Sequence, residues 1–236
     1  MFRDTIYLIA LLMLATITGF AATVVQSQAC QDWANYDTVW TCTFPSPTAK
    51  GNAIIVFALG YSTATVTGGT GNSYALDLNH LFGGRQRIMF FSAANANPAH
   101  MITVTYGSIT QMQIVVMELS GLATTGPLLD RTATNDNGYF SNCSSGRTFT
   151  SGVTAKTSQG NEFMVGWTEQ AYPNVMNFID DAPWVMVAQE PIGGSRIAYR
   201  HAISTGRFAY TGRFSGSGEC DVGAAILTYK SASTGR

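Results

Sequence analysis

Short runs of β-branched and aromatic residues recur along most of this chain, separated by clusters of Gly, Asn, Ser and Pro. Outside the N-terminal segment, no window of about a dozen residues keeps a helical apolar period, so the pattern is typical of strands. Turn clusters such as Thr67–Asn72, Asn95–Pro98 and Asn135–Gly138 contain residues that tolerate positive φ. The predicted strands are Ala53–Leu59, Ser62–Thr67, Ile88–Ser92, Met101–Tyr106, Gln113–Leu119, Glu162–Thr168, Trp184–Gln189, Ile197–His201, Phe208–Phe214 and Ala224–Tyr229. Their spacing predicts an all-β fold, an antiparallel two-sheet β-sandwich.

The N-terminal segment has the pattern of an export signal. Arg3 supplies a positive charge, and Ile6–Ala22 is almost wholly apolar. Small residues offer cleavage sites after Ala21 or after Ala29. The apolar run is also near the lower length limit for crossing a bilayer, so an uncleaved N-terminal anchor helix is the alternative. We therefore expect a secreted or cell-surface protein that contacts the membrane only through this segment, if at all.

The chain has four cysteines, and none of them has the two-residue spacing of a zinc or haem site. In an oxidising compartment an even number of cysteines favours two disulfides, for which three connectivities exist. We expect Cys30–Cys42 to fix the N-terminal arm and Cys143–Cys220 to close a long loop. Four reduced thiols in the core are the alternative.

An internal similarity links two parts of the chain. Gly51-Asn52 recurs 109 positions later as Gly160-Asn161, and Arg87–Phe90 resembles Arg196–Tyr199 at the same offset. A constant offset over tens of residues indicates two related halves, although chance similarity between β-rich segments would also produce it.

The domain organisation follows from these patterns. Residues 1–29 form a signal peptide or anchor, and residues 30–236 form one sandwich domain. Within it, the related halves span about 48–121 and 154–231, which gives a single folded unit and not two free domains. The stretch Leu122–Val153 is the least strand-like, and we expect it to be a long surface crossover.

The low charge of the chain limits its partners. Charged residues make up 11% of the sequence, against a usual share of about 25%, and the formal net charge is −1. A nucleic-acid partner is therefore not expected, because a phosphate backbone would find little attraction. Surfaces covered by Ser, Thr, Asn, Gln and Gly are frequent in exported β proteins and in subunits that pack against copies of themselves. Self-association through edge strands fits this composition.

The sequence offers no catalytic motif. His80, His100 and His201 are scattered, and no serine lies in a Gly-x-Ser-x-Gly elbow. Asp180 and Asp181 are sequence neighbours, so on a strand they would point to opposite faces and could not act as a pair of glycosidase carboxyls. We predict a protein that is not an enzyme, with a secreted hydrolase as the weakest alternative.

A metal or cofactor is not expected from the sequence. Asp130 and Asp136, the latter inside an Asn-Asp-Asn-Gly run, are a weak candidate pair for calcium, which takes oxygen ligands. Turn-forming preference explains the same residues without a metal.

Aromatic residues next to carboxylates are the strongest candidates for a ligand site. Sugar rings present apolar faces that pack on aromatic rings, while their hydroxyls need carboxylates and amides as hydrogen-bond partners. Filling of the sandwich core is the alternative role for the same rings. The candidate ligand-binding residues are Trp33, Trp40, Tyr172, Trp184, Glu169 and Asp181.

Six segments carry a resemblance to a known group of proteins: Gly51–Val56, Val66-Thr67, Gly71–Tyr74, Met117–Leu122, Pro127–Asp130 and Gly160–Phe163. Together they resemble uncharacterised bacterial exported β-sandwich domains that occur in large surface or adhesin-like proteins. The resemblance implies a jelly-roll-like fold and a surface role, and it carries no catalytic residues. This chain departs from the group by its four cysteines and by standing alone.

The sequence therefore predicts a non-enzymatic binding or adhesion module for a glycan or a cell surface. A self-assembling structural subunit of an extracellular filament or a virion is the main alternative.

Overall fold

A computed structural model describes residues 22–83, 86–144, 146–170, 176–189, 194–216 and 218–232. These residues form an all-β fold of antiparallel sheets without any helix, which confirms the predicted all-β class. None of them belongs to a helix long and apolar enough to cross a membrane. The predicted leader or anchor helix, up to residue 21, lies outside the described residues.

The strands include every predicted one and several that the sequence pattern did not reveal. In chain order they are β1 (Thr23–Thr43), β2 (Ala53–Gly60), β3 (Ala64–Thr67), β4 (Ala75–Phe82), β5 (Gln86–Ala93), β6 (Met101–Ser120), β7 (Leu129–Phe140), β8 (Arg147–Thr150), β9 (Glu162–Gln170), β10 (Met176–Asp180), β11 (Val185–Gln189), β12 (Ser195–Ala202), β13 (Thr211–Gly216) and β14 (Cys220–Tyr229). Two predicted strands merge into the single long β6.

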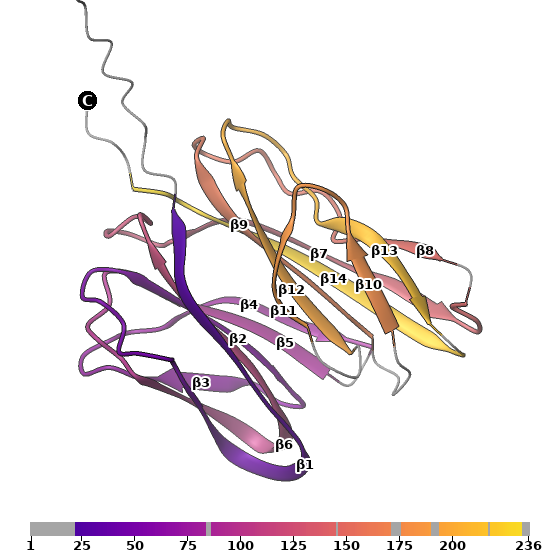
Figure 1. Ribbon diagram of the computed structural model, residues 1–236, viewed down its shortest axis with the longest axis horizontal. Helices are drawn as coiled ribbons and strands as arrows, with labels where there is room; N and C mark the ends of the chain where they lie inside the picture. The colour runs from indigo at the N-terminus through magenta and orange to yellow at the C-terminus, as the bar shows by residue number, and fades with distance from the viewer. Residues whose placement is uncertain are drawn as a thin grey trace, which may run out of the picture.

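The first half of the molecule, β1 to β6, and the second half, β7 to β14, have the same strand order. The first sheet runs β1-β6-β2-β5-β4, with β3 also on β6, and the second runs β7-β14-β9-β12-β11. A further small sheet, β10-β13-β8, belongs to the second half (Figure 1). In the first half, β1 and β6 curl together as one ribbon, whose register shifts twice between Asp32 and Val39.

The strand ladders relate the halves by two different offsets. The pair Ala53↔Leu119 corresponds to Phe163↔Tyr229, a shift of 110 residues in both strands. Across the β2–β5 and β9–β12 ladders, however, Phe90 corresponds to Ile197, a shift of 107. The offset of 109 in the sequence is therefore not kept, because the connecting loops differ in length.

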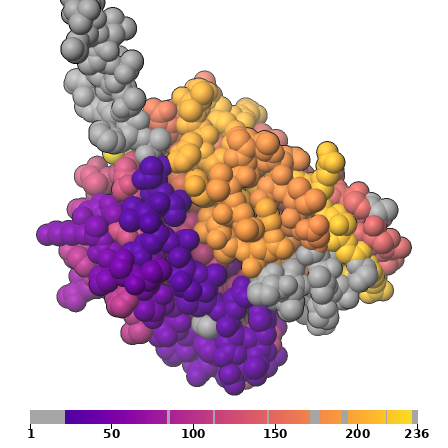
Figure 2. Space-filling view, in the orientation of Figure 1, coloured from indigo at the N-terminus to yellow at the C-terminus, as the bar shows by residue number. Residues whose placement is uncertain are grey.

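Strict alternation of buried side chains divides the molecule into a central and two outer cores. Ile55 and Phe57 of β2 meet Val165 and Trp167 of β9 in the central core, between the six-stranded sheet of the first half and the five-stranded sheet of the second. The residues between them, such as Val56, point into the outer core of their own half. Because both faces are covered, all residues of β2 and β9 are buried. Figure 2 shows the two halves in direct contact along their common border.

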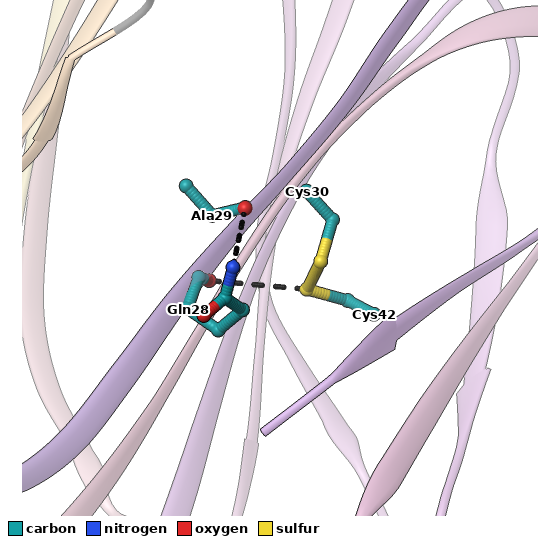
Figure 3. The surroundings of a disulfide bond; sticks show 4 residues. All are labelled: Gln28, Ala29, Cys30 and Cys42. Atoms are coloured by element: carbon teal, nitrogen blue, oxygen red, sulfur yellow. Dashed lines mark hydrogen bonds between the residues drawn. A yellow bond between two sulfur atoms is a disulfide. The ribbon is translucent and has the colours of Figure 1, made fainter. Parts of the chain in front are cut away.

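Both expected disulfides are present. Cys30 and Cys42 join the two arms of the bent strand β1, with Cα atoms 5.5 Å apart (Figure 3). The Cys42 sulfur also lies 3.9 Å from the Gln28 carbonyl oxygen, but a disulfide sulfur carries no hydrogen, so this is a contact and not a hydrogen bond. Cys143 and Cys220 join the segment after β7 to the start of β14.

The stretch Leu122–Val153 is not the surface crossover that we expected. It contains β7 and β8, and the expected turn Asn135–Gly138 lies inside β7. Gly138 has a φ of 93°, and it lies next to a bulge where β14 shifts register between Val222 and Gly223. An edge strand that is half exposed can hold polar residues, which explains why its sequence has the composition of a turn.

The start of the folded domain bears on the two cleavage sites. Ala22 is fully buried, and residues 23–29 of β1 pair with β6. A cut after Ala29 would remove this pairing, whereas a cut after Ala21 would leave β1 intact.

Candidate functional site

A hollow opens where the β1–β6 ribbon bends past the end of β2. Its volume is about 180 Å³, counting the space at its mouth. Trp33 enters from β1, just beyond the pair Asp32↔Met112, and Gln86 begins β5. The lining residues are Trp33, Leu59, Gly60, Tyr61, Gln86, Thr110 and Gln111. Aromatic rings and side-chain amides thus face one space.

Two polar atoms of this lining are buried and have no hydrogen-bond partner within the described part of the chain. They are the indole Nε1 of Trp33, which only donates, and the amide Oε1 of Gln86, which only accepts. Buried polar atoms are nearly always bonded, so an unpaired donor and acceptor in one hollow indicate a missing polar partner. A hydroxyl group or a water molecule can serve both, because each donates and accepts.

The hollow is narrow and fixed in shape. The space open to a water-sized sphere is about 10 Å³, which is room for about one water molecule or one hydroxyl group. The side-chain amide of Gln111 donates to the Trp33 carbonyl, and the Trp40 indole donates to the Thr110 carbonyl at 3.0 Å. These bonds hold the bend of the ribbon and set the position of the Trp33 ring.

A buried polar cluster joins the two halves at the same end of the central core. Ser195 Oγ lies 2.9 Å from Gln113 Oε1 and 2.8 Å from Glu169 Oε2. A hydroxyl has one hydrogen, so it donates to the Glu169 carboxylate, and the Gln113 amide is better turned to donate its NH₂ to Ser195. With no histidine bonded to Ser195 and all three side chains at most 2% exposed, the cluster holds the halves together and does not form a nucleophile.

The predicted ligand residues fall into separate places. Trp33 and Glu169 belong to opposite halves but lie at the same end of the central core. Trp33 comes two residues after Gln31, which pairs with Gln113, and Ser195 joins Gln113 to Glu169. Trp40 packs on the outer core of the first half, and Trp184 on that of the second. Asp181 accepts a hydrogen bond from Thr211 on the second half, at 2.7 Å. Tyr172 lies outside the described residues. The five described residues therefore do not form one face.

Trp184 lies beside a tight polar network under the small sheet. Its ring packs edge-on against Tyr210, with centroids 4.7 Å apart. The Asp180 carboxylate pairs with Arg196 at 2.7 Å and accepts from the Tyr210 hydroxyl at 2.6 Å. Burial, and secondarily the Asp180 charge, raise the pKa of Tyr210 far above its ordinary value. This network fixes the turn that connects β10 in the small sheet to β11 in the larger one.

Each half has one buried glutamate at the start of an inner strand: Glu118 lies beside the start of β2, and Glu162 begins β9. Glu118 accepts hydrogen bonds from Gln26 and Asn52, each at 2.6 Å. In the second half, Glu162 is fully buried beside Thr228 and Asp130, and burial raises its pKa to about 7. A substrate cannot reach Glu162, which is fully buried. Glu118 and Glu162 therefore hold the starts of β2 and β9 and do not act as a catalytic pair.

The two calcium candidates do not converge. Asp130 accepts from the Ser158 backbone and hydroxyl at 2.6 and 2.7 Å, while Asp136 pairs with His80 at 2.8 Å. Across the described ranges, no group of three or more His, Cys, Asp or Glu side chains could hold a metal ion.

The residues that sequence reasoning missed are Tyr61, Gln86, Gln111 and Gln113. They come from two strands, β5 and β6, and one loop, and no local motif marks them. The one available signal was alternation: Gln113 occupies an inward position in a strand whose other inward residues are apolar.

Comparison with protein-family models, with characterised proteins and with solved structures found no match, so the function is argued from this chain's own residues.

Proposed function

We propose that the protein is a non-enzymatic glycan-binding module, and that the hollow at Trp33 and Gln86 receives one hydroxyl group of a sugar. The observation that carries the proposal is the unpaired donor of Trp33 and the unpaired acceptor of Gln86 in one narrow space. A hydroxyl group can accept from the indole N–H of Trp33 and donate to the amide oxygen of Gln86. Leaving such atoms unpaired costs about 1–3 kcal/mol each, so satisfying them favours binding.

The rest of the sugar ring would lie over the mouth of the hollow. Tyr61 lines it and is 44% exposed, so its ring offers an apolar face for the C–H groups of a sugar. Gln111, which is partly exposed, supplies a further polar group in the lining. Carboxylates are absent from the described lining, so a neutral sugar fits better than a cationic one.

We infer that the protein works outside the cytoplasm. Two disulfides fit an oxidising compartment, and the apolar segment before β1 has the pattern of an export signal. The resemblance to exported surface domains points the same way. It also suggests that each half is a jelly-roll-like unit, which the arms of the β1–β6 ribbon support. Residues 23–32 pair with β6 beside β2, whereas 39–43 pair with β6 beside β3.

The test is a titration of the protein with neutral cello-, manno- and chito-oligosaccharides by calorimetry. Trp33→Phe removes the indole donor together with part of the ring, and Gln86→Met removes the whole side-chain amide, including its acceptor oxygen. We expect each to weaken binding at least about tenfold, while the exposed Tyr139→Phe, on the edge strand β7, binds as the parent does. Absence of binding to all three sugar types, or unchanged binding by both variants, contradicts the proposal.

A structural subunit is the second candidate, and one observation favours it. The edge strand β11 exposes Val185 and Met186 at 48% and 52%, and the edge strand β10 exposes Ile179 at 56%. An open edge with apolar side chains can pair with a strand of another copy. Light scattering at increasing concentration tests it: growth in mass that Met186→Lys abolishes supports assembly, and a constant monomer mass removes the idea.

A further inference from the structure

Arg200 of β12 is a partly buried cation without a counter-charge. Its guanidinium carbon lies 5.5 Å from the centre of the Trp184 ring and 5.8 Å from that of Phe208. Its Nε is buried and has no hydrogen-bond partner among the described residues. Within that part of the chain, no carboxylate pairs with Arg200. Burial lowers the pKa of its guanidinium, because a buried charge is less well solvated.

The nearby carboxylates are already occupied. Asp180 is paired with Arg196 and Tyr210, and Asp181 accepts from Thr211. Arg196 and Arg200 lie four positions apart on the same face of β12, yet among the described residues only Arg196 of the two has an acidic partner. Buried charges are normally paired with an opposite charge, so the unpaired Arg200 indicates a place for an anion on this face of β12.

The two rings beside the guanidinium are each held by further contacts. Trp184 packs on Tyr210, and its backbone N–H donates to the Asp181 carbonyl at 3.3 Å. Phe208 exchanges two bonds with Thr154: its N–H donates to the threonine hydroxyl at 3.0 Å, and its carbonyl accepts the threonine N–H at 2.9 Å. Fixed rings keep the planar guanidinium in place, and a guanidinium can bind a planar anion with two parallel hydrogen bonds.

We propose that Trp184, Arg200 and Phe208 form a second ligand site, which binds the carboxylate of an acidic sugar. One guanidinium balances the single charge of a carboxylate, and its fork matches the carboxylate in shape. The half-buried rings beside it suit the apolar face of the sugar that carries the acid. The assignment of a sugar rests on the proposed glycan function, whereas the site itself is separate from the hollow at Trp33.

The test compares two ligands that differ only at the acid: oligogalacturonate and its methyl ester. We expect the parent protein to bind oligogalacturonate at least tenfold more tightly than the ester. Arg200→Met should remove this preference, Arg200→Lys should keep part of it, and the matched control Arg213→Met, an exposed arginine on β13, should keep all of it. Thermal unfolding of each variant checks that it remains folded. If Arg200→Met is unfolded, the test rests on Arg200→Lys, which should bind the acid less tightly than the parent does.

Several results would overturn the site. They are equal binding of acid and ester, an equal loss in Arg213→Met, or a glutamate-containing peptide bound as tightly as oligogalacturonate. Trp33→Phe should leave the preference for the acid unchanged. Loss of neutral-sugar binding alone therefore counts against the hollow, and loss of the acid preference alone counts against Arg200.

Discussion

Phe57 and Trp167 stack across the centre of the molecule, with ring centroids 6.3 Å apart and planes 29° from parallel. Each occupies the same ladder position in its own sheet, because Phe57 pairs with Val115 and Trp167 with Ala225. Contact between corresponding residues is the geometry of a two-fold symmetric interface, here within one chain. The central core therefore joins the halves into one folding unit.

Mutation of this ring pair should show coupling. Phe57→Leu and Trp167→Phe should each lower the free energy of unfolding by about 1–3 kcal/mol, because both side chains are fully buried. The double variant should lose less than the sum by about 0.5–1.5 kcal/mol, the value of an aromatic contact. Denaturant unfolding of all four proteins measures this, and strict additivity would show that the rings do not interact.

Gly166 should not tolerate a side chain. A Cβ there would lie only 2.4 Å from the Tyr210 ring, in the outer core of the second half. Gly166→Ala should cost about 1–3 kcal/mol through overpacking. Gly107→Ala is the control, because a Cβ at that position meets nothing closer than 3.6 Å. Equal melting temperatures for the two variants would argue against this packing of β9 on Tyr210.

The all-β class and both disulfides could be predicted, because alternation and an even cysteine count are local or countable signals. The edge strand β4 escaped prediction: Asp77 and Asn79 interrupt its apolar residues, and it has a bulge between Leu76 and Leu78. The hollow escaped as well, because Trp33 and Gln86 are brought together only by the curl of the β1–β6 ribbon. Tertiary placement, and not local sequence, decides which aromatic residue faces solvent.

The two disulfides should differ in their effect on stability. Cys143–Cys220 closes a loop of 77 residues and Cys30–Cys42 one of 12. Loop-closure entropy predicts losses of about 4 and about 3 kcal/mol when each pair is changed to alanine. Denaturant unfolding of the two double-alanine variants measures the difference. A larger loss for the short loop would show that native-state contacts dominate.

Asp77 should make stability depend on pH. Its carboxyl lies beside the Ser92 and Tyr229 hydroxyls, and burial raises its pKa from 3.8 to about 6. The folded protein thus holds this proton more tightly than the unfolded chain, so Asp77 favours folding least above pH 6. Asp77→Asn should therefore stabilise the protein by about 1–2 kcal/mol at pH 8, after allowance for partial exposure, and by almost nothing at pH 4. A variant less stable than the parent at pH 8 would contradict this reading.

The most direct test of the binding hollow is the indole N–H signal of Trp33. The chain has four tryptophans, so a nitrogen–proton spectrum gives four indole signals that single Trp→Phe variants can assign. On titration with the oligosaccharide that binds, the Trp33 signal should shift, because its Nε1 gains a hydrogen bond. The buried Trp167 indole, which also lacks a partner among the described residues, should stay in place. A bound sugar that leaves the Trp33 signal unmoved would contradict the proposed site.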